Sequence, residues 1–246
     1  MLAWSKIAPD RRDLLADLVG EYAHNYARGR TVLAVDGPDG AGTREFADDL
    51  ALAFRRAGYT VARASVDDFR RPRAERLARG ADDPEGRYRD EFDYSVLRRV
   101  LVEPFRMGGS SSFVTAAFDV DRDAPLEPDW QDGPADLVLI IDGVFLNRPE
   151  LAGLWNWSIW LDADEPVRFA RLAELTGADP DPDAPSNDRL TGALRMYVAD
   201  AHPNTRADAI VDNTDPARPK RRFADYCSVP PPPTGVRARG RRPSRG

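Results

Sequence analysis

The stretch that decides the fold is Thr31-Val-Leu-Ala-Val-Asp-Gly-Pro-Asp-Gly-Ala-Gly-Thr-Arg44, an apolar run followed by a glycine-rich turn. The run at 31–35 predicts a short buried strand. A helix follows, marked by apolar residues at helical spacing from Phe46 to Phe54, and it closes at Gly58. A strand, a glycine loop and a helix in this order form the context that a phosphate-binding loop requires.

The loop matches the pattern G-x-x-x-x-G-K-[ST] in its glycines but not in the two residues after them. Gly37 and Gly42 fall in register, whereas Thr43 stands at the Lys position and Arg44 at the Ser/Thr position. In working loops the Lys neutralises the outer phosphates and the hydroxyl helps to hold Mg²⁺. Thr43 and Arg44 offer a hydroxyl and a charge, each one position out of place. The motif alone therefore leaves a nucleotide site and a plain glycine turn open.

The rest of the chain predicts an α/β fold, in which a parallel sheet carries helices on both faces as three αβα layers. Three predicted strands end in acids, at Asp36, at Asp67 with Asp68, and at Asp142. Ligands of such sheets bind at the carboxyl ends of the strands. The further strands are predicted over 60–65, 113–119, 137–141, 157–161 and 209–211, and the further helices over about 10–28, 94–101, 166–175 and 187–201.

The net charge of −6 hides an asymmetry between the body of the chain and its end. Residues 218–246 carry nine Arg or Lys against one acid, a net +8, so residues 1–217 carry −14. An acidic body is not typical of a specific nucleic-acid binder. The sequence predicts one domain over 1–217 and a disordered, Pro/Arg-rich basic tail over 218–246.

The chain lacks the features of secreted and membrane proteins. No apolar run reaches the length of a membrane span, and the first residues lack the pattern of a secretory signal. Cys227 is the only cysteine, and His24 and His202 are the only histidines, which excludes a disulfide framework and disfavours histidine metal sites. We expect a cytoplasmic protein; the oligomeric state stays open, a homo-oligomer included.

Four short motifs follow the glycine loop: Ser65-Val-Asp-Asp-Phe-Arg-Arg-Pro72, Tyr88-Arg-Asp-Glu-Phe-Asp93, Ile140-Ile-Asp-Gly-Val-Phe145 and Val211-Asp-Asn-Thr-Asp215. Their order resembles the uridine kinase/phosphoribulokinase group of P-loop kinases, particularly the uridine kinase-like proteins of high-GC bacteria. The resemblance runs from about residue 31 to residue 215. It implies a P-loop NTPase fold and a kinase that uses ATP and Mg²⁺ to phosphorylate a hydroxyl of a small molecule, foremost a nucleoside such as uridine.

The resemblance also implies roles for single residues. Asp67 matches the general base, which takes the proton of the acceptor hydroxyl, and Asp142 matches the Walker-B acid that orients Mg²⁺. Arg168 and Arg171 match the basic lid over the phosphates. Each has a plainer alternative: a helix cap for Asp67, an Asp-Gly turn for Asp142, and a solvated helix face for the two arginines.

The remaining implied site residues fall into three sets. The nucleotide set comprises Gly37, Asp39, Gly40, Ala41, Gly42, Thr43 and Arg44, with Asn213 beside the adenine. The metal set comprises Thr43 and Asp142. The acceptor set comprises Asp68, Asp90, Phe118 and Arg189.

A second departure from the family pattern lies late in the chain. Related proteins often carry Arg-Tyr-x-x-Gly-Gln, and the stretch here is Arg189-Leu-Thr-Gly-Ala-Leu194. Three hypotheses follow: a nucleoside kinase, a catalytically impaired relative that binds a nucleotide or a partner, and a kinase for another acceptor. In the third, Arg44 or the rim arginines 70, 71, 73 and 76 replace the missing lysine or receive an anionic substrate.

Overall fold

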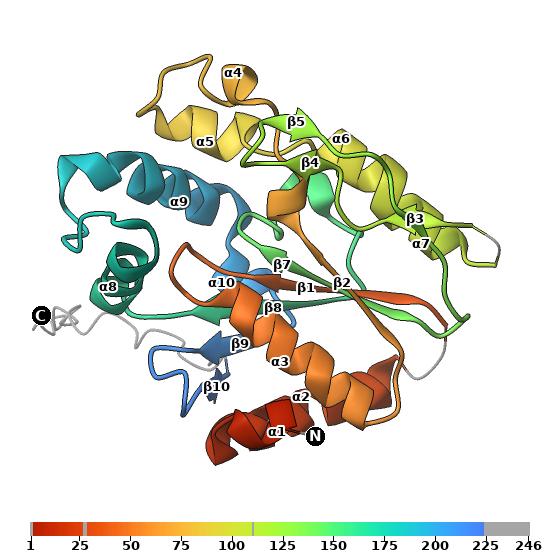
Figure 1. The fold of residues 1–246 in the computed structure, drawn as a ribbon. Coiled ribbons are helices and arrows are strands. Elements are labelled where there is room, and N and C mark those ends of the chain that lie inside the picture. The colour runs from red at the N-terminus through yellow and green to blue at the C-terminus, as the bar shows by residue number, and fades with distance from the viewer. Residues whose placement is uncertain (1, 27–28, 110, 224–246) are drawn as a thin grey trace, which may run out of the picture.

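The computed structural model describes residues 2–26, 29–109 and 111–223 (Figure 1). Within them, one main sheet has the strand order β10-β9-β8-β1-β7-β2. Its neighbouring strands run parallel, except that β10 is antiparallel to β9 at the edge. The strands of this sheet are β1 (Thr31–Asp36), β2 (Val61–Ser65), β7 (Val138–Gly143), β8 (Trp157–Asp162), β9 (Ala209–Asp212) and β10 (Lys220–Arg222).

Helices cover both faces of the sheet: α1, α2 and α3 lie on one side, and α5 and α9 on the other (Figure 1). The α-helices are α1 (Leu2–Lys6), α2 (Pro9–Asn25), α3 (Thr43–Arg56), α4 (Arg73–Arg76), α5 (Pro84–Asp90), α6 (Tyr94–Val96), α7 (Glu103–Met107), α8 (Glu165–Thr176), α9 (Asp188–Ala201) and α10 (Pro203–Arg206). The shorter helical segments are η1 (Val66–Phe69), η2 (Leu97–Val102, π-helical), η3 (Pro149–Leu151) and η4 (Pro185–Asn187).

The core has two layers because the central strands are buried on both faces. In β1, Val32 and Ala34 pack into one apolar cluster, and Leu33 and Val35 pack into the other. The second cluster also holds the apolar faces of α2 and α3, while the first holds residues of α7 and α9. Continuous apolar strands are what a parallel sheet covered on both sides needs. The predicted three-layer α/β fold is therefore confirmed.

One strand prediction was wrong. Residues 113–119 do not form a single strand but two short ones in separate two-stranded sheets: β3 (Phe113–Val114) pairs with β6 (Trp130–Gln131), and β4 (Phe118–Asp119) pairs with β5 (Ala124–Pro125). Between β3 and β4, the amide of Ala117 donates to the carbonyl of Asp68, 2.9 Å away.

Two predicted helices end at other residues than expected. The helix expected over 94–101 continues through η2 into α7 and ends at Met107, and α2 ends at Asn25 rather than near residue 28. None of the helices in the described ranges combines the length and the apolar composition that a membrane span needs.

The predicted boundary between domain and tail also lies too early. Lys220–Arg222 forms β10, in which Arg221 pairs with Val211, so the sheet extends past residue 217. A run of basic residues gives no apolar signal for a strand, but charged side chains are typical of an exposed sheet edge. The rest of the predicted disordered tail, residues 224–246 with Cys227, lies outside the described residues.

Candidate functional site

The glycine loop joins β1 to α3 at the carboxyl edge of the sheet. Gly40 and Gly42 have φ angles of +78° and +86°, a region that glycine adopts at little cost. A Cβ on Gly37 would lie 2.4 Å from the carbonyl oxygen of Leu161, and one on Gly40 would lie 2.4 Å from that of Arg168. The loop is therefore built from glycine both for its backbone angles and for its close packing.

The loop leads directly into the first turn of α3, which begins at Thr43. Gly42 is the N-cap, and no side chain caps this end of the helix in the described structure. The first amides of a helix lack partners within the helix, and the helix dipole places positive charge there. This end of α3 therefore has the geometry of an anion site, with Thr43 and Arg44 as its first two residues.

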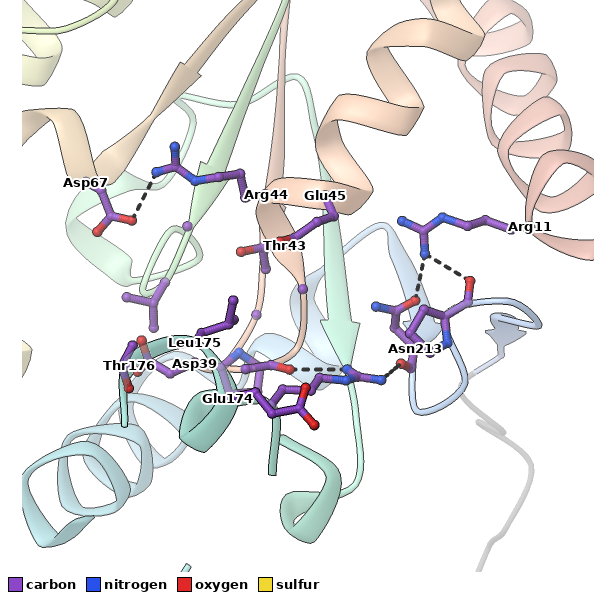
Figure 2. A pocket seen from close by; sticks show the side chains of 18 of the residues that line it. Arg11, Asp39, Thr43, Arg44, Glu45, Asp67, Glu174, Leu175, Thr176 and Asn213 are labelled. Carbon is purple, nitrogen blue, oxygen red and sulfur yellow. Dashed lines mark hydrogen bonds and ion pairs between the residues drawn. The ribbon is translucent and has the colours of Figure 1, made fainter. Parts of the chain in front are cut away.

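The loop forms one wall of a cavity of about 650 Å³. Figure 2 shows Arg44 and Asp67 pointing toward one another on one side of it, and Arg11 and Asn213 on the other. The cavity thus joins the loop, the start of η1 and the chain after β9. The predicted site residues that line it are Gly37, Asp39, Gly40, Gly42, Thr43, Arg44, Asp67, Arg171 and Asn213.

Asp67 lies between two guanidinium groups. Arg70 donates from Nε and Nη2 to its Oδ1, at 3.2 and 2.6 Å, and Arg44 Nη2 lies 3.6 Å from its Oδ2. The helix cap is Ser65, whose Oγ accepts from the amide of Asp67 at 3.4 Å, so Asp67 is not the cap that the plainer alternative required. Its carboxylate is left facing the glycine loop across the cavity.

The side chain of Arg44 extends toward the end of β2, where it lies near Asp67 and Ser65. Its Nη2 lies 3.4 Å from Ser65 Oγ. Burial lowers the pKa of Arg44, but Asp142, Asp67 and Asp68 outweigh burial and raise it. Burial in turn raises the pKa of Asp68, and Arg44 opposes that rise. Arg44 is thus the cation that these carboxylates share.

Both carboxylate oxygens of Asp142 have hydrogen-bond partners within the protein. Arg63 Nη2 donates to its Oδ1 at 2.7 Å, and Ser65 Oγ lies 3.2 Å from its Oδ2. Its side chain is 3% exposed. Burial raises the pKa of Asp142, and the two arginines Arg63 and Arg44 oppose that rise.

These contacts test the predicted Mg²⁺ site. Mg²⁺ takes oxygen ligands with near-octahedral geometry and is usually held by one or two carboxylates. Both oxygens of Asp142 already have partners, and Arg44 stands where the loop pattern expects a hydroxyl. The residues present do not fit a Mg²⁺ ion held by Thr43 and Asp142.

The two predicted lid arginines bind the backbone of the loop. Arg168 Nη1 donates to the carbonyl of Asp39 and Arg171 Nη1 to that of Gly40, both at 3.2 Å. Arg171 Nη2 also donates to the carbonyl of Thr214, at 2.8 Å. Burial lowers the pKa of both guanidinium groups. They fasten α8 to the glycine loop, and neither is a simple solvated helix face.

Asn213 fastens the other side of the loop. Its Nδ2 donates to the carbonyl of the buried Ala41 at 2.7 Å, and its Oδ1 accepts from Arg11 Nη1 at 3.1 Å. Arg11 also donates to Asp49, at 2.7 Å. Sequence analysis missed Arg11, although one signal was present: it continues, one turn earlier, the helical stripe of buried leucines in α2.

None of the four predicted acceptor residues lines the cavity. Asp90 pairs with Arg79 at 2.8 Å, Phe118 is buried in β4, and Arg189 pairs with Glu91 at 3.0 Å. Asp68, the fourth, is next to Asp67 in η1 but is not part of the lining either.

Glu91 is the second residue that sequence analysis missed. Its side chain is fully buried and has four arginines around it, one of which, Arg87, also binds both carboxylate oxygens of Asp39 at 2.8 Å. Two of the predicted rim arginines are thereby tied to an internal acid instead of facing solvent. The arginine nitrogens nearest to Glu91 are those of Arg70 (2.5 Å), Arg189 (3.0 Å), Arg76 (3.3 Å) and Arg87 (3.7 Å).

Asp36, at the end of β1, belongs to a buried network. The hydroxyl of Tyr197 donates to its Oδ2, and Asn147 donates to the same oxygen from Nδ2 at 2.7 Å. Burial raises the pKa of Asp36 to about 6, and the hydrogen bonds from Tyr197 and Asn147 oppose that rise. Asp36 therefore belongs to this buried network and does not line the cavity.

Comparison with known proteins agrees with this architecture. No family model matches the sequence, and no curated protein matches it. Solved structures do match: a possible uridine kinase from Bacillus stearothermophilus has a TM-score of 0.64 at 23% identity, over 82% of this chain and 97% of that one. A candidate fructose transport system kinase from a Silicibacter species has a TM-score of 0.65 at 23% identity, over 80% and 98%.

A more distant likeness joins these two. The D-glycerate 3-kinase from Cryptococcus neoformans has a TM-score of 0.51 at 12% identity, over 82% of this chain and 95% of that one. At such identities the likenesses establish the fold alone, a mostly parallel sheet with helices on both faces.

Proposed function

We propose that this protein is a phosphotransferase that moves the γ-phosphoryl group of ATP to a hydroxyl of a small molecule. The observation that carries the proposal is the shared cavity, in which the glycine loop at the start of α3 faces the carboxylate of Asp67. A phosphate site and a carboxylate within one cavity are the two parts that this reaction requires.

In the proposed step, the acceptor hydroxyl attacks the γ-phosphorus, the bond to the β-phosphate oxygen breaks, and ADP leaves. Asp67 accepts the hydroxyl proton. Arg70 holds Asp67 Oδ1 through two hydrogen bonds, so Oδ2 is the oxygen that can receive the proton. Loop amides and the first turn of α3 hold the phosphates, and positioning and charge supply most of the catalysis in such reactions.

We propose a nucleoside such as uridine as the acceptor. The support is the order of motifs from residue 31 to residue 215, together with the likeness to a possible uridine kinase. The likenesses to a fructose transport system kinase and to a glycerate kinase set the competing acceptors, which are sugars and hydroxy acids.

A second candidate function is nucleotide binding without turnover. The observation that favours it is Thr43 at the Lys position of the loop, since that Lys stabilises the transferring phosphoryl group. Among the described residues that line the cavity there is no lysine.

The test is acceptor-dependent release of ADP by the full chain, with nucleosides, sugars and hydroxy acids offered in turn. We expect release with a nucleoside and a loss of about 100-fold or more in Asp67→Asn, the usual size for removal of a general base. Asp17→Asn, which removes a carboxylate from the exposed face of α2, is the control. ATP binding without release for any acceptor would favour the second candidate.

A further inference from the structure

We infer that Arg44 takes the place of the metal ion, so that this cavity binds the phosphates of a nucleotide without a divalent cation. The inference rests on the proposed function, because it concerns phosphate binding in the same cavity. It differs from the use of ATP with Mg²⁺ that the family resemblance implies.

The position of Arg44 in the loop is the first argument. It stands where the pattern has a Ser or Thr, whose hydroxyl contacts Mg²⁺ in phosphate-binding loops. From this position the guanidinium extends to 3.6 Å from Asp67 Oδ2 (Figure 2). It also lies 3.4 Å from Ser65 Oγ. The fixed cation therefore lies beside the acid proposed as base, at the edge of the cavity where the strand-end acids meet.

The partners of Asp142 are the second argument. The acid that would orient the metal is bound on one oxygen by Arg63 at 2.7 Å and on the other by Ser65 at 3.2 Å. Its side chain is nearly inaccessible to water, so a hydrated ion would have to displace Arg63 to reach it. Releasing Arg63 from a buried carboxylate would leave that charge uncompensated, which is strongly unfavourable.

The chemistry of the guanidinium is the third argument. It remains charged at every accessible pH, and its planar N–H groups match phosphate oxygens in bidentate geometry. The Arg44 side chain is 56% exposed, and Arg44 lines the cavity, so donors that do not face Asp67 are open to a ligand. A metal ion supplies charge at this place in related loops; here one side chain supplies both the charge and the hydrogen bonds.

The experiment is isothermal titration of the full chain with ATP, once with EDTA and once with Mg²⁺. The variant is Arg44→Ser, which removes the cation and restores the hydroxyl of the usual pattern. The control is Arg55→Ser, which removes the same charge from the exposed far end of the same helix. Circular dichroism spectra compare the folding of each variant with that of the wild type.

We expect the wild type and Arg55→Ser to bind ATP in EDTA with dissociation constants within about threefold of those in Mg²⁺. Arg44→Ser should bind at least about tenfold more weakly in EDTA, the size of one lost charge-assisted hydrogen bond.

Three results would overturn the inference. Wild-type binding that requires Mg²⁺ would overturn it and leave the proposed nucleotide site standing. Binding in EDTA that Arg44→Ser does not weaken would assign the charge to another residue. No binding in either buffer would remove both the inference and the proposed function.

Discussion

The guanidinium of Arg63 lies 2.7 Å from Oδ1 of Asp142, at a place where the Asp142 side chain is 3% exposed. A strand-end acid in this fold is expected to face a metal ion; here it faces an arginine of the neighbouring strand, because β2 and β7 pair in parallel and Arg63 lies opposite Ile140. The charge of the buried Asp142 carboxylate is therefore balanced by an arginine and not by a metal ion.

Arg63→Gln is expected to destabilise the protein by about 3 kcal/mol at neutral pH, since it leaves the buried carboxylate of Asp142 without its ion-pair partner. Urea unfolding followed by circular dichroism measures the change. Arg55→Gln, an exposed arginine, should shift the free energy of unfolding by no more than about 0.5 kcal/mol. Equal effects in the two variants would mean that the Arg63–Asp142 pair is not a buried one in solution.

Gly40→Ala should damage the loop through steric contact as well as backbone strain. Its φ is +78°, and its Cβ would lie 2.4 Å from the carbonyl oxygen of Arg168. Gly58→Ala is the matched control, because Gly58 has φ +95° with nothing within 4 Å of the added atom. Strain alone costs about 1–2 kcal/mol, so Gly40→Ala should lose clearly more unfolding free energy than Gly58→Ala. A smaller loss for Gly40→Ala would contradict the packing of α8 on the loop.

Glu91→Gln is expected to cost about 3 kcal/mol of stability, because four arginines surround this one buried carboxylate. Glu85→Gln is the control: its ion pairs with Arg79 and Arg89 are exposed and are worth less than about 1 kcal/mol. Chemical unfolding at pH 7 compares the two. If Glu91→Gln were as mild as Glu85→Gln, the cluster would not organise this side of the site.

Asp36 should give the protein a measurable pH dependence. Its pKa is about 6 in the folded chain, against 3.8 for an unperturbed Asp, so the native state holds a proton that the unfolded state releases between these values. The stabilising contribution is therefore complete below about pH 4 and is lost as the pH rises through 6, by about 3 kcal/mol in total.

Asp36→Asn removes this titration. The free energy of unfolding of the wild type minus that of Asp36→Asn should fall by about 3 kcal/mol between about pH 4 and pH 7. Urea titrations at both pH values measure it, with Asp17→Asn on exposed α2 as the control for loss of one carboxylate. A difference that stays constant, or rises with pH, would contradict a buried Asp36 with a raised pKa.

Sequence periodicity predicted the central fold well. The apolar runs that became β1, β7 and β8 are buried on both faces, and glycine placement located the loop, because only glycine fits at Gly37 and Gly40. The strands β3 and β4 were predicted as one strand and β5 and β6 were not predicted, since each has two residues and its pairing depends on distant partners.

The polar part of the site was less predictable. The proximity of Asp67 to the loop followed from the rule that ligands bind at strand ends. In contrast, the pairing of Arg63 with Asp142 depends on the register of two strands, and the burial of Glu91 depends on Arg70, which follows η1, and on arginines from α4, α5 and α9. No local pattern encodes which of many arginines meets which acid in a chain that is 31% charged.

The most direct test of the central claim is to compare ATP with adenosine in isothermal titration of the wild-type chain. The claim is that the glycine loop and the first turn of α3 bind phosphates, so ATP should bind about 100-fold or more tightly than adenosine, as several charge-assisted hydrogen bonds require. Equal affinity for the two ligands, or no binding of ATP, would contradict a phosphate site in this loop.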